Sequence, residues 1–290
     1  MQLDFQELDR IIQTALVEDV GSGDITSELT ISDADQLRVA FVTRQKIVTC
    51  GLPVLERIPK LKIADGEVEF KALVSEGDIV ESGSVLASWQ GNARMILALE
   101  RTALNILQHM SAIATHTNNY VSEMNNKDAK LLDTRKTTPG LRHIEKYAVH
   151  IGGGMNHRYN LSDGIMIKDN HISACGGDVT LAVRKAKAGA PEGMKVEVEC
   201  DTLEQVELAI AAEADILLLD NMNCNLLQKA VSLVKGSGKN ITTEASGGVT
   251  LETIRAIAQT GVDSISVGAL THSAGSVDIG LDAEFISPAI

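Results

Sequence analysis

The sequence predicts an α/β protein in which a small N-terminal part with a mixed sheet precedes an α/β barrel, closed or incomplete. Two observations carry this prediction. After Asn126, short apolar runs alternate with helical stretches six times, which is the pattern of right-handed βαβ units and a parallel sheet. Before that point, strand-like segments are separated by turn signals instead. The 290 residues suffice for one barrel-sized domain with a smaller companion.

The N-terminal part should begin with an amphipathic helix over residues 5–18, because Leu8, Ile11, Ile12, Ala15 and Leu16 share one face. Three strand-like stretches follow it: LRVAFVTRQKIVTCG (37–51), GEVEFKALV (66–74) and SVLASW (84–89). Asn92 then suits the N-cap of a long helix over residues 92–121. This helix is apolar nearly all round, so we expect it to be buried between domains or between subunits.

The barrel part should contain six strands, at 130–133, 164–168, 195–199, 215–220, 241–244 and 264–268. Helical stretches separate them at 178–188, 202–212, 225–234 and 251–259. In a parallel barrel the loops at the C-terminal ends of the strands form the site. Five of the six strands deliver an ionisable residue there, and the strand ends carry Asp133 with Arg135 and Lys136, Lys168, Glu199, Asp220, Glu244 and Gly268. The pattern therefore predicts one functional site at that mouth.

Charge narrows the kind of ligand. The formal net charge is −13, but residues 131–171 hold six Lys or Arg against four Asp or Glu, and four of the seven histidines. Such a local patch suits a small anionic ligand, and the surrounding negative charge disfavours nucleic acid as a partner. Within the patch, Arg142, His143 and Lys146 fall in a helical stretch, where we expect a solvated face.

The composition argues against membrane, secreted and cysteine-stabilised proteins. With 44% hydrophobic and 22% charged residues the chain reads as a soluble globular protein, and no apolar run approaches the roughly 20 residues of a membrane helix. The acidic start MQLDFQELDR is unlike a secretory signal, so we expect a cytoplasmic protein without a membrane partner. Four cysteines lack any CxxC pair and are expected to be reduced packing residues: Cys50, Cys175, Cys200 and Cys224.

Glycines that follow two predicted strands indicate a phosphate-binding site. Ser246-Gly247-Gly248 and Gly268 follow strands, where backbone N–H groups could approach a phosphate, although simple turns are the alternative. No nucleotide-triphosphate loop is present, and Gly152-Gly153-Gly154 follows a helix, which argues against a dinucleotide fold. Guanidinium groups suit carboxylates and lysines suit phosphates, while Glu199 and Asp220 could hold Mg²⁺ or sugar hydroxyls. Together these residues favour group transfer at the anomeric carbon of a phosphorylated sugar.

Several long motifs resemble the quinolinate phosphoribosyltransferase family: DTRKTTPGLR (133–142), GGGMNHR (152–158), IKDNH (167–171) and ERTALN (100–105). The likeness covers nearly the whole chain. It implies transfer of phosphoribosyl from phosphoribosyl pyrophosphate to quinolinate with Mg²⁺, giving nicotinate mononucleotide, pyrophosphate and CO₂ in NAD synthesis.

The resemblance also implies roles for individual residues. The quinolinate site would comprise Arg101 from a partner subunit, Thr134, Arg135, His157, Arg158 and Lys168. The phosphate and ribose site would comprise Lys136, Glu199, Asp220, Ser246, Gly247, Gly248, Val267, Gly268 and Ala269. Of these, Lys136, Glu199 and Asp220 would be catalytic, and Glu199 and Asp220 would be the metal ligands.

The family architecture implied is an N-terminal α/β open sandwich over 1–112, rejoined by the tail 273–290, and an incomplete, seven-stranded α/β barrel over 113–272. The seventh strand would lie at 156–161. Implied too is a homodimer with shared active sites, with a hexamer left open. Two departures from the usual family pattern, Ala112 and the pair Tyr159-Asn160, leave these ligands unchanged.

Three other readings stay open at this point. A molybdenum-associated paralogue of the same fold typically departs from the NHR and KDNH patterns, which are intact here. A Schiff-base aldolase could use Lys168, but its lysine needs an apolar pocket, whereas this one shares its site with other charges. A non-catalytic phosphate-sensing barrel is the third.

Overall fold

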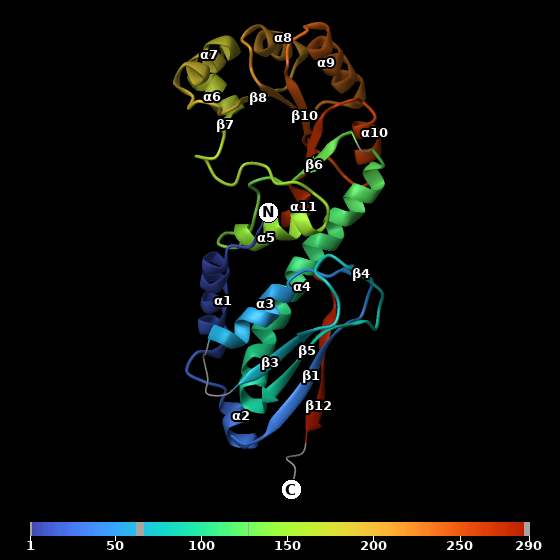
Figure 1. The fold of residues 1–290 in the computed structure, drawn as a ribbon. Helices are drawn as coiled ribbons and strands as arrows, with labels where there is room; N and C mark the ends of the chain where they lie inside the picture. The colour runs from blue at the N-terminus through green and yellow to red at the C-terminus, as the bar shows by residue number, and fades with distance from the viewer. Residues whose placement is uncertain (1, 62–66, 127, 287–290) are drawn as a thin grey trace. The chain divides into compact units, whose positions relative to one another are not determined.

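The computed structural model describes residues 2–61, 67–126 and 128–286. The chain divides into two compact units, which are described separately; Figure 1 labels their elements. The first unit comprises Met1–Asn118, Thr137–Gly153 and Ala269–Ile290, and the second comprises Asn119–Lys136 and Gly154–Gly268. The domain boundaries expected from the sequence, at residues 112 and 273, stay a prediction.

The first unit is built on an antiparallel sheet with the strand order β12-β1-β5-β3. Its strands are β1 (Gln36–Thr43), β3 (Val68–Ala72), β5 (Val85–Asn92) and β12 (Ile279–Ile286), and a separate pair is formed by β2 (Ile47–Val48) and β4 (Ile79–Val80). Strand β12 pairs with β1 from Gln36 to Thr43, so the C-terminal segment joins the N-terminal sheet. The Trp89 indole packs edge-on to Phe41 at 5.0 Å between ring centroids and donates to the Leu55 carbonyl, which anchors the core.

The helices of the first unit are α1 (Phe5–Val20), α2 (Ile25–Thr30), α3 (Leu52–Arg57), a 3-10 turn (Ile58–Leu61), most of α4 (Ala93–Met124), α5 (Arg142–Ile151) and α11 (Ala269–His272). Helix α1 buries four of the five residues that periodicity placed on its apolar face, and the fifth, Ala15, is half-buried. The Asn92 side chain accepts from the Met95 N–H at 2.9 Å, which confirms the predicted cap of α4. Most side chains of α4 are buried or half-buried within this one chain.

Helix α5 corrects one expectation. The predicted solvated face is wrong for Lys146, which is fully buried, and for His143, which is 6% exposed. The reason is tertiary: α5 packs against α1 and α11, and the Asp4 N–H donates to His143 Nε2 at 2.9 Å. The charge pattern of a helix does not show which of its faces another element will cover.

The second unit is a six-stranded parallel sheet in the order β6-β11-β10-β9-β8-β7. Its strands are β6 (Lys130–Leu132), β7 (Ile165–Ile167), β8 (Val196–Cys200), β9 (Ile216–Asp220), β10 (Thr242–Ser246) and β11 (Ser264–Ser266). All six match predicted strands. Between them run α6 (Asp169–Ala174), α7 (Val179–Gly189), α8 (Leu203–Ala211), α9 (Cys224–Gly236) and α10 (Ile254–Ala258). In Figure 1, α7, α8 and α9 lie outside the strands, as βαβ units require.

The position of a seventh strand differs from the prediction. Residues 156–158 have no regular secondary structure, and residues 159–161 form bends and a turn. Side chains bond to the backbone here in place of a strand partner; for example, Asp163 Oδ2 accepts from the Tyr159 N–H at 2.7 Å. Instead Met155, one residue earlier, makes an isolated parallel bridge to Leu132. The segment before His157 is thereby fixed to the free edge of β6.

No helix within the described ranges is long and apolar enough to cross a membrane. The four cysteines are free, with Cys50 and Cys200 buried, as packing residues would be.

Candidate functional site

The parallel sheet brings most of the predicted site residues to one edge. Thr134, Arg135 and Lys136 directly follow β6, Lys168 follows β7, and Gly268 lies two residues after β11. Glu199, Asp220 and Ser246 are at or next to the last residues of β8, β9 and β10. Because all neighbouring pairs are parallel, these positions share the C-terminal edge, where barrel enzymes place their chemistry.

Three carboxylate side chains cluster where β8 and β9 end. Ligand oxygens of Glu199, Asp201 and Asp220 lie within 4.8 Å of one another, and Lys168 Nζ lies 3.1 Å from Glu199 Oε2. Burial and the nearby charges of Asp220 and Asp169 raise the pKa of Asp201. Sequence reasoning missed Asp201, although its place two residues after Glu199 was the available signal. Oxygen donors of this kind are those Mg²⁺ prefers.

Two guanidinium groups form the cationic part. Arg158 Nη1 donates to the Gly164 carbonyl at 2.8 Å, and both Arg135 and Arg158 are half-buried. Burial lowers the pKa of Arg158, and the charge of Arg135 lowers it further, while the charge of Glu197 opposes them. Two like charges held in a partly desolvated place would be stabilised by an anion, and a guanidinium fork suits a carboxylate.

Asp133 fixes the segment that carries His157 and Arg158. Its carboxylate is fully buried and accepts from the His157 N–H at 2.8 Å and from Asn156 Nδ2 at 2.7 Å. Backbone bonds join the same segment to β6, since the Met155 N–H donates to the Leu131 carbonyl at 2.8 Å. The sequence placed Asp133 at a strand end. In the structure it is the hydrogen-bond acceptor that positions Asn156 and His157.

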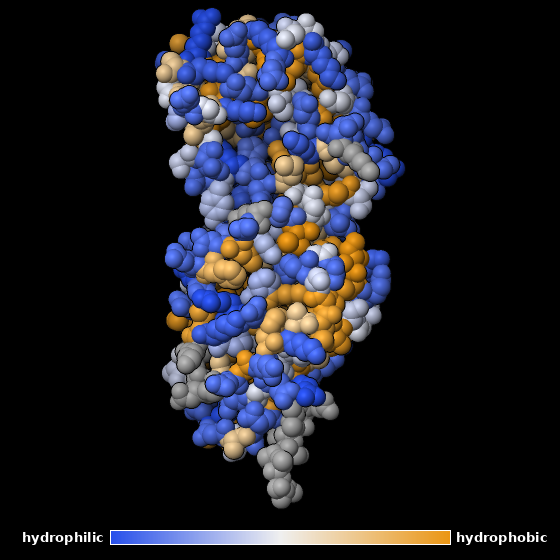
Figure 2. All heavy atoms as spheres, viewed as in Figure 1, coloured by the Kyte–Doolittle hydropathy of each residue, from blue (hydrophilic) through white to orange (hydrophobic). Residues whose placement is uncertain are grey.

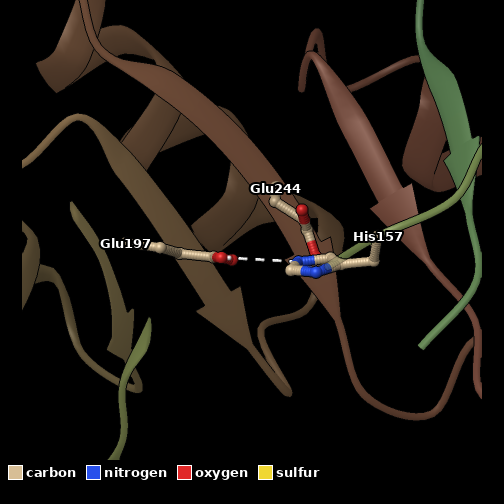
Figure 3. Close-up of side chains that lie close together, drawn as sticks. All are labelled: His157, Glu197 and Glu244. Atoms are coloured by element: carbon tan, nitrogen blue, oxygen red, sulfur yellow. Dashed lines mark ion pairs between the residues drawn. The ribbon is translucent and has the colours of Figure 1, made fainter. Parts of the chain in front are cut away.

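The ring of His157 points toward two buried carboxyl groups, those of Glu197 and Glu244 (Figure 3). Its Nε2 is 3.4 Å from Glu197 Oε2 and 3.6 Å from Glu244 Oε1. Glu244 was expected at the mouth, but this is wrong: β10 continues to Ser246, so Glu244 lies inside the strand and is 2% exposed. Glu197 likewise lies two residues before Glu199, on the same face of β8.

The turn after β10 is packed closely on the end of β9. Gly247 has φ +88°, and a Cβ there would lie 2.1 Å from Asn221 Oδ1. The Asn221 N–H donates to the Ser246 carbonyl at 2.8 Å, and its Nδ2 donates to Asp220 Oδ2 at 2.5 Å. The glycine is therefore needed for close approach, and it ties the predicted phosphate turn to a predicted ribose or metal ligand. Asn221 was assigned no role from the sequence.

A cavity of about 980 Å³ is lined by residues from the other ends of the strands. It includes the first residues of five strands, Lys130, Ile165, Ile216, Thr242 and Ser264. It is also lined by Glu197 on β8, by Glu244 on β10, and by His157 and Arg158 in the segment before β7. Two predicted quinolinate ligands, His157 and Arg158, therefore line this cavity, whereas the predicted ligands that follow the strands lie at the C-terminal edge.

Two predicted residues belong to the first unit. Arg101 lies on α4 with an exposed side chain, and Ala269 begins α11. Val267 is buried, and its N–H donates to the Leu132 carbonyl at 3.0 Å, so its backbone donor is already used within the sheet.

Comparison with known proteins covers both parts of the chain. Residues 24–111 match the family described as quinolinate phosphoribosyl transferase, N-terminal domain, and residues 113–282 match its C-terminal domain. A probable nicotinate-nucleotide pyrophosphorylase (carboxylating) of Bacillus subtilis is 41% identical over 95% of this chain and 93% of its own length. The nicotinate-nucleotide pyrophosphorylase (carboxylating) of Mycobacterium leprae is 42% identical over 93% of this chain and 95% of its own.

Solved structures agree. NadC from Streptococcus pyogenes superposes with a TM-score of 0.92 at 40% identity, covering 99% of this chain and all of its own. A nicotinate-nucleotide pyrophosphorylase from Ehrlichia chaffeensis gives a TM-score of 0.90 at 40% identity, with 98% of this chain and all of its own covered.

Proposed function

The chain belongs to the quinolinate phosphoribosyltransferase family, and we propose that it carries out the reaction that gives the family its name. It transfers phosphoribosyl from phosphoribosyl pyrophosphate to quinolinate, releases pyrophosphate and CO₂, and leaves nicotinate mononucleotide for NAD synthesis. The observation that carries the proposal is the C-terminal strand edge. Arg135 and Lys136 follow β6 there, and Lys168 follows β7 and pairs with Glu199, which clusters with Asp220.

Quinolinate carries two adjacent carboxylates, which need two positive partners. Arg135 and Arg158 are near enough for the charge of one to lower the pKa of the other, so one dianion would relieve both. Thr134 and Lys168, which follow β6 and β7, and His157, which precedes Arg158 in the chain, complete the proposed grip. We assign the more exposed Lys136 to the pyrophosphate side, where a mobile point charge suffices.

The sugar phosphate would meet the other strand ends. Ser246, Gly247, Gly248 and Gly268 offer main-chain groups to a phosphate, and Glu199 and Asp220 face the ribose or a metal. Glu199, Asp201 and Asp220 fit Mg²⁺, because three carboxylate ligand atoms converge within 4.8 Å. Bound there, Mg²⁺ would supply positive charge to the departing pyrophosphate.

The chemistry needs positioning and charge more than proton transfer. The pyridine nitrogen already carries a lone pair, so it attacks the anomeric carbon as the bond to pyrophosphate breaks. The cationic, oxocarbenium-like sugar is stabilised by nearby carboxylates such as Glu199 and Asp220. The quaternised ring then accepts the electron pair released when the adjacent carboxylate leaves as CO₂, and the ring carbon takes a proton from water.

We further propose a homodimer in which Arg101 serves the site of the partner subunit. The support is twofold: Arg101 is exposed on α4, and hydrophobic side chains gather on the first unit near β4 in Figure 2. Exposed apolar residues at the strands of this unit are Leu73 after β3, Ile79 on β4 and Val85 on β5. Exposed apolar patches of this sort are typical of subunit contacts.

The aldolase reading loses support in the structure. Lys168 Nζ pairs with Glu199 at 3.1 Å and is about half exposed, whereas a Schiff-base lysine needs an apolar pocket.

The test follows CO₂ from quinolinate labelled at the leaving carboxyl. We expect release that depends on phosphoribosyl pyrophosphate and Mg²⁺ and is lost in Arg135→Ala, while the fold measured by circular dichroism is unchanged. Release without phosphoribosyl pyrophosphate, or full activity in Arg135→Ala, would contradict the proposal.

A further inference from the structure

Two glutamates lie inside the parallel sheet, one step below the strand ends that bear the proposed ligands. Side chains two residues apart on a strand share a face, so Glu197 lies below Glu199 and Glu244 below Ser246. Glu197 is 4% exposed and Glu244 is 2% exposed. One oxygen of each, Oε1, is buried without a hydrogen-bond partner. Buried carboxyl oxygens left in this state need an explanation, because their desolvation is costly.

The two carboxyls converge on the same atom. Nε2 of His157 lies 3.4 Å from Glu197 Oε2 and 3.6 Å from Glu244 Oε1. Nδ1 of the same ring accepts the Arg158 N–H at 2.7 Å. A neutral imidazole that accepts a hydrogen bond at Nδ1 carries its ring hydrogen on Nε2. The hydrogen-bond pattern therefore assigns the hydrogen of His157 to Nε2, on the side of the two carboxyls.

We propose that Glu244 is a positioning residue of the anion site: in its neutral form, with Glu197, it holds the imidazole of His157 by Nε2 from inside the sheet. The inference rests on the proposed function, because the anion is quinolinate. The neutral form matters because a second ionised carboxylate would add negative charge directly below a site that must accept a dianion.

The surroundings of Glu244 support a neutral form near pH 7. Burial raises its pKa to about 7, and the charge of Glu197 acts in the same direction. His157 and the hydroxyls of Ser264 and Ser266 on β11 act in the opposite direction. The other charged group in this network is Arg158, which interacts with Glu197.

The sign of the effect follows from these charges. Below about pH 7 Glu244 is protonated, the interior carries less negative charge, and quinolinate binds best. Above that pH Glu244 ionises and repels the carboxylates of quinolinate. The KM for quinolinate should therefore rise with pH, by about fivefold or more for one added charge in a partly buried place.

The experiment uses the full chain with phosphoribosyl pyrophosphate and Mg²⁺ at saturation. The KM for quinolinate is measured on both sides of pH 7 for the wild type, Glu244→Gln and the control Glu207→Gln. Glu207 is exposed on α8, so its variant removes one charge away from the site. Glutamine imitates the protonated carboxyl, so Glu244→Gln should keep a low KM across the range, within about twofold of the wild-type value at acid pH.

Wild type and Glu207→Gln should both show the rise, and the KM for phosphoribosyl pyrophosphate should be the same in Glu244→Gln as in wild type. A merely structural role would change both KM values at every pH. A wild-type rise that persists in Glu244→Gln would overturn the inference.

Infrared spectroscopy supplies a readout that does not depend on activity. The wild type should show the carbonyl stretch of a buried, protonated carboxyl, which fades as pH rises through 7, shifts in Glu244→Asp and is lost in Glu244→Gln. The band in the wild type tests whether Glu244 is protonated even if Glu244→Gln fails to fold. Its absence from the wild type at every pH would contradict the inference. An enzyme that releases no CO₂ from quinolinate but shows the band would instead refute the proposed function.

Discussion

At the scale of single residues, Asp133 determines where the cationic part of the site lies. Its two oxygens hold the His157 N–H and the Asn156 side chain, and no part of it is exposed. Asp133→Ala leaves both donors without this acceptor, and a buried unsatisfied donor costs about 1–3 kcal/mol. We expect the free energy of unfolding in urea to fall by that amount and the KM for quinolinate to rise more than the KM for phosphoribosyl pyrophosphate.

The swapped pair Asp133→Asn with Asn156→Asp is the matched control. It keeps an acceptor for the His157 N–H and exchanges donor and acceptor between the two side chains. We expect it to recover most of the lost stability and most of the affinity for quinolinate. A swapped variant no better than Asp133→Ala would show that these two hydrogen bonds do not position the segment.

At the scale of an element, the turn after β10 depends on one glycine. In Gly247→Ala the new Cβ would meet Asn221 Oδ1 at 2.1 Å and the residue would keep a positive φ, so the turn must move away from the end of β9. We expect the KM for phosphoribosyl pyrophosphate to rise at least tenfold, that is by about 1.4 kcal/mol of binding, with a smaller change in the KM for quinolinate.

Gly238→Ala separates backbone strain from this contact. Gly238 also has a positive φ, +66°, but nothing lies within 4 Å of its would-be Cβ. It should therefore lose about 1 kcal/mol of stability without a change in either KM. Equal kinetic effects in the two variants would refute the special role of Gly247.

The same scale shows what the sequence could and could not predict. All six parallel strands were predictable, because a strand buried on both faces is a short apolar run between turn signals. The candidate ligands at the strand ends could be predicted once the strands were placed. The interior position of Glu244 could not be predicted, because β10 extends two residues beyond the predicted end. Its sequence TTEAS (242–246) is mostly polar and does not look like a buried strand. Lys146 was misjudged for a related reason, because burial against α1 and α11 is decided by tertiary packing.

At the scale of the whole molecule, the proposed shared site makes two inactive variants complement each other. Arg101→Ala and Arg135→Ala should each lack activity. After mixing with subunit exchange, half of the dimers should be mixed, and one of the two sites in each should be intact, giving about a quarter of wild-type activity. Exchange is checked by mass spectrometry of differently labelled chains. No recovery despite proven exchange would remove the shared-site proposal.

The central claim is that this chain joins quinolinate to phosphoribosyl pyrophosphate and decarboxylates it. The most direct measurement quantifies CO₂ and pyrophosphate released by the purified protein with both substrates and Mg²⁺, with nicotinate as the matched control substrate. We predict equal molar amounts of the two products with quinolinate and neither with nicotinate, which lacks the second carboxylate that the Arg135 and Arg158 pair would bind. Absence of CO₂ at saturating substrates, or turnover of nicotinate at a comparable rate, would contradict the account.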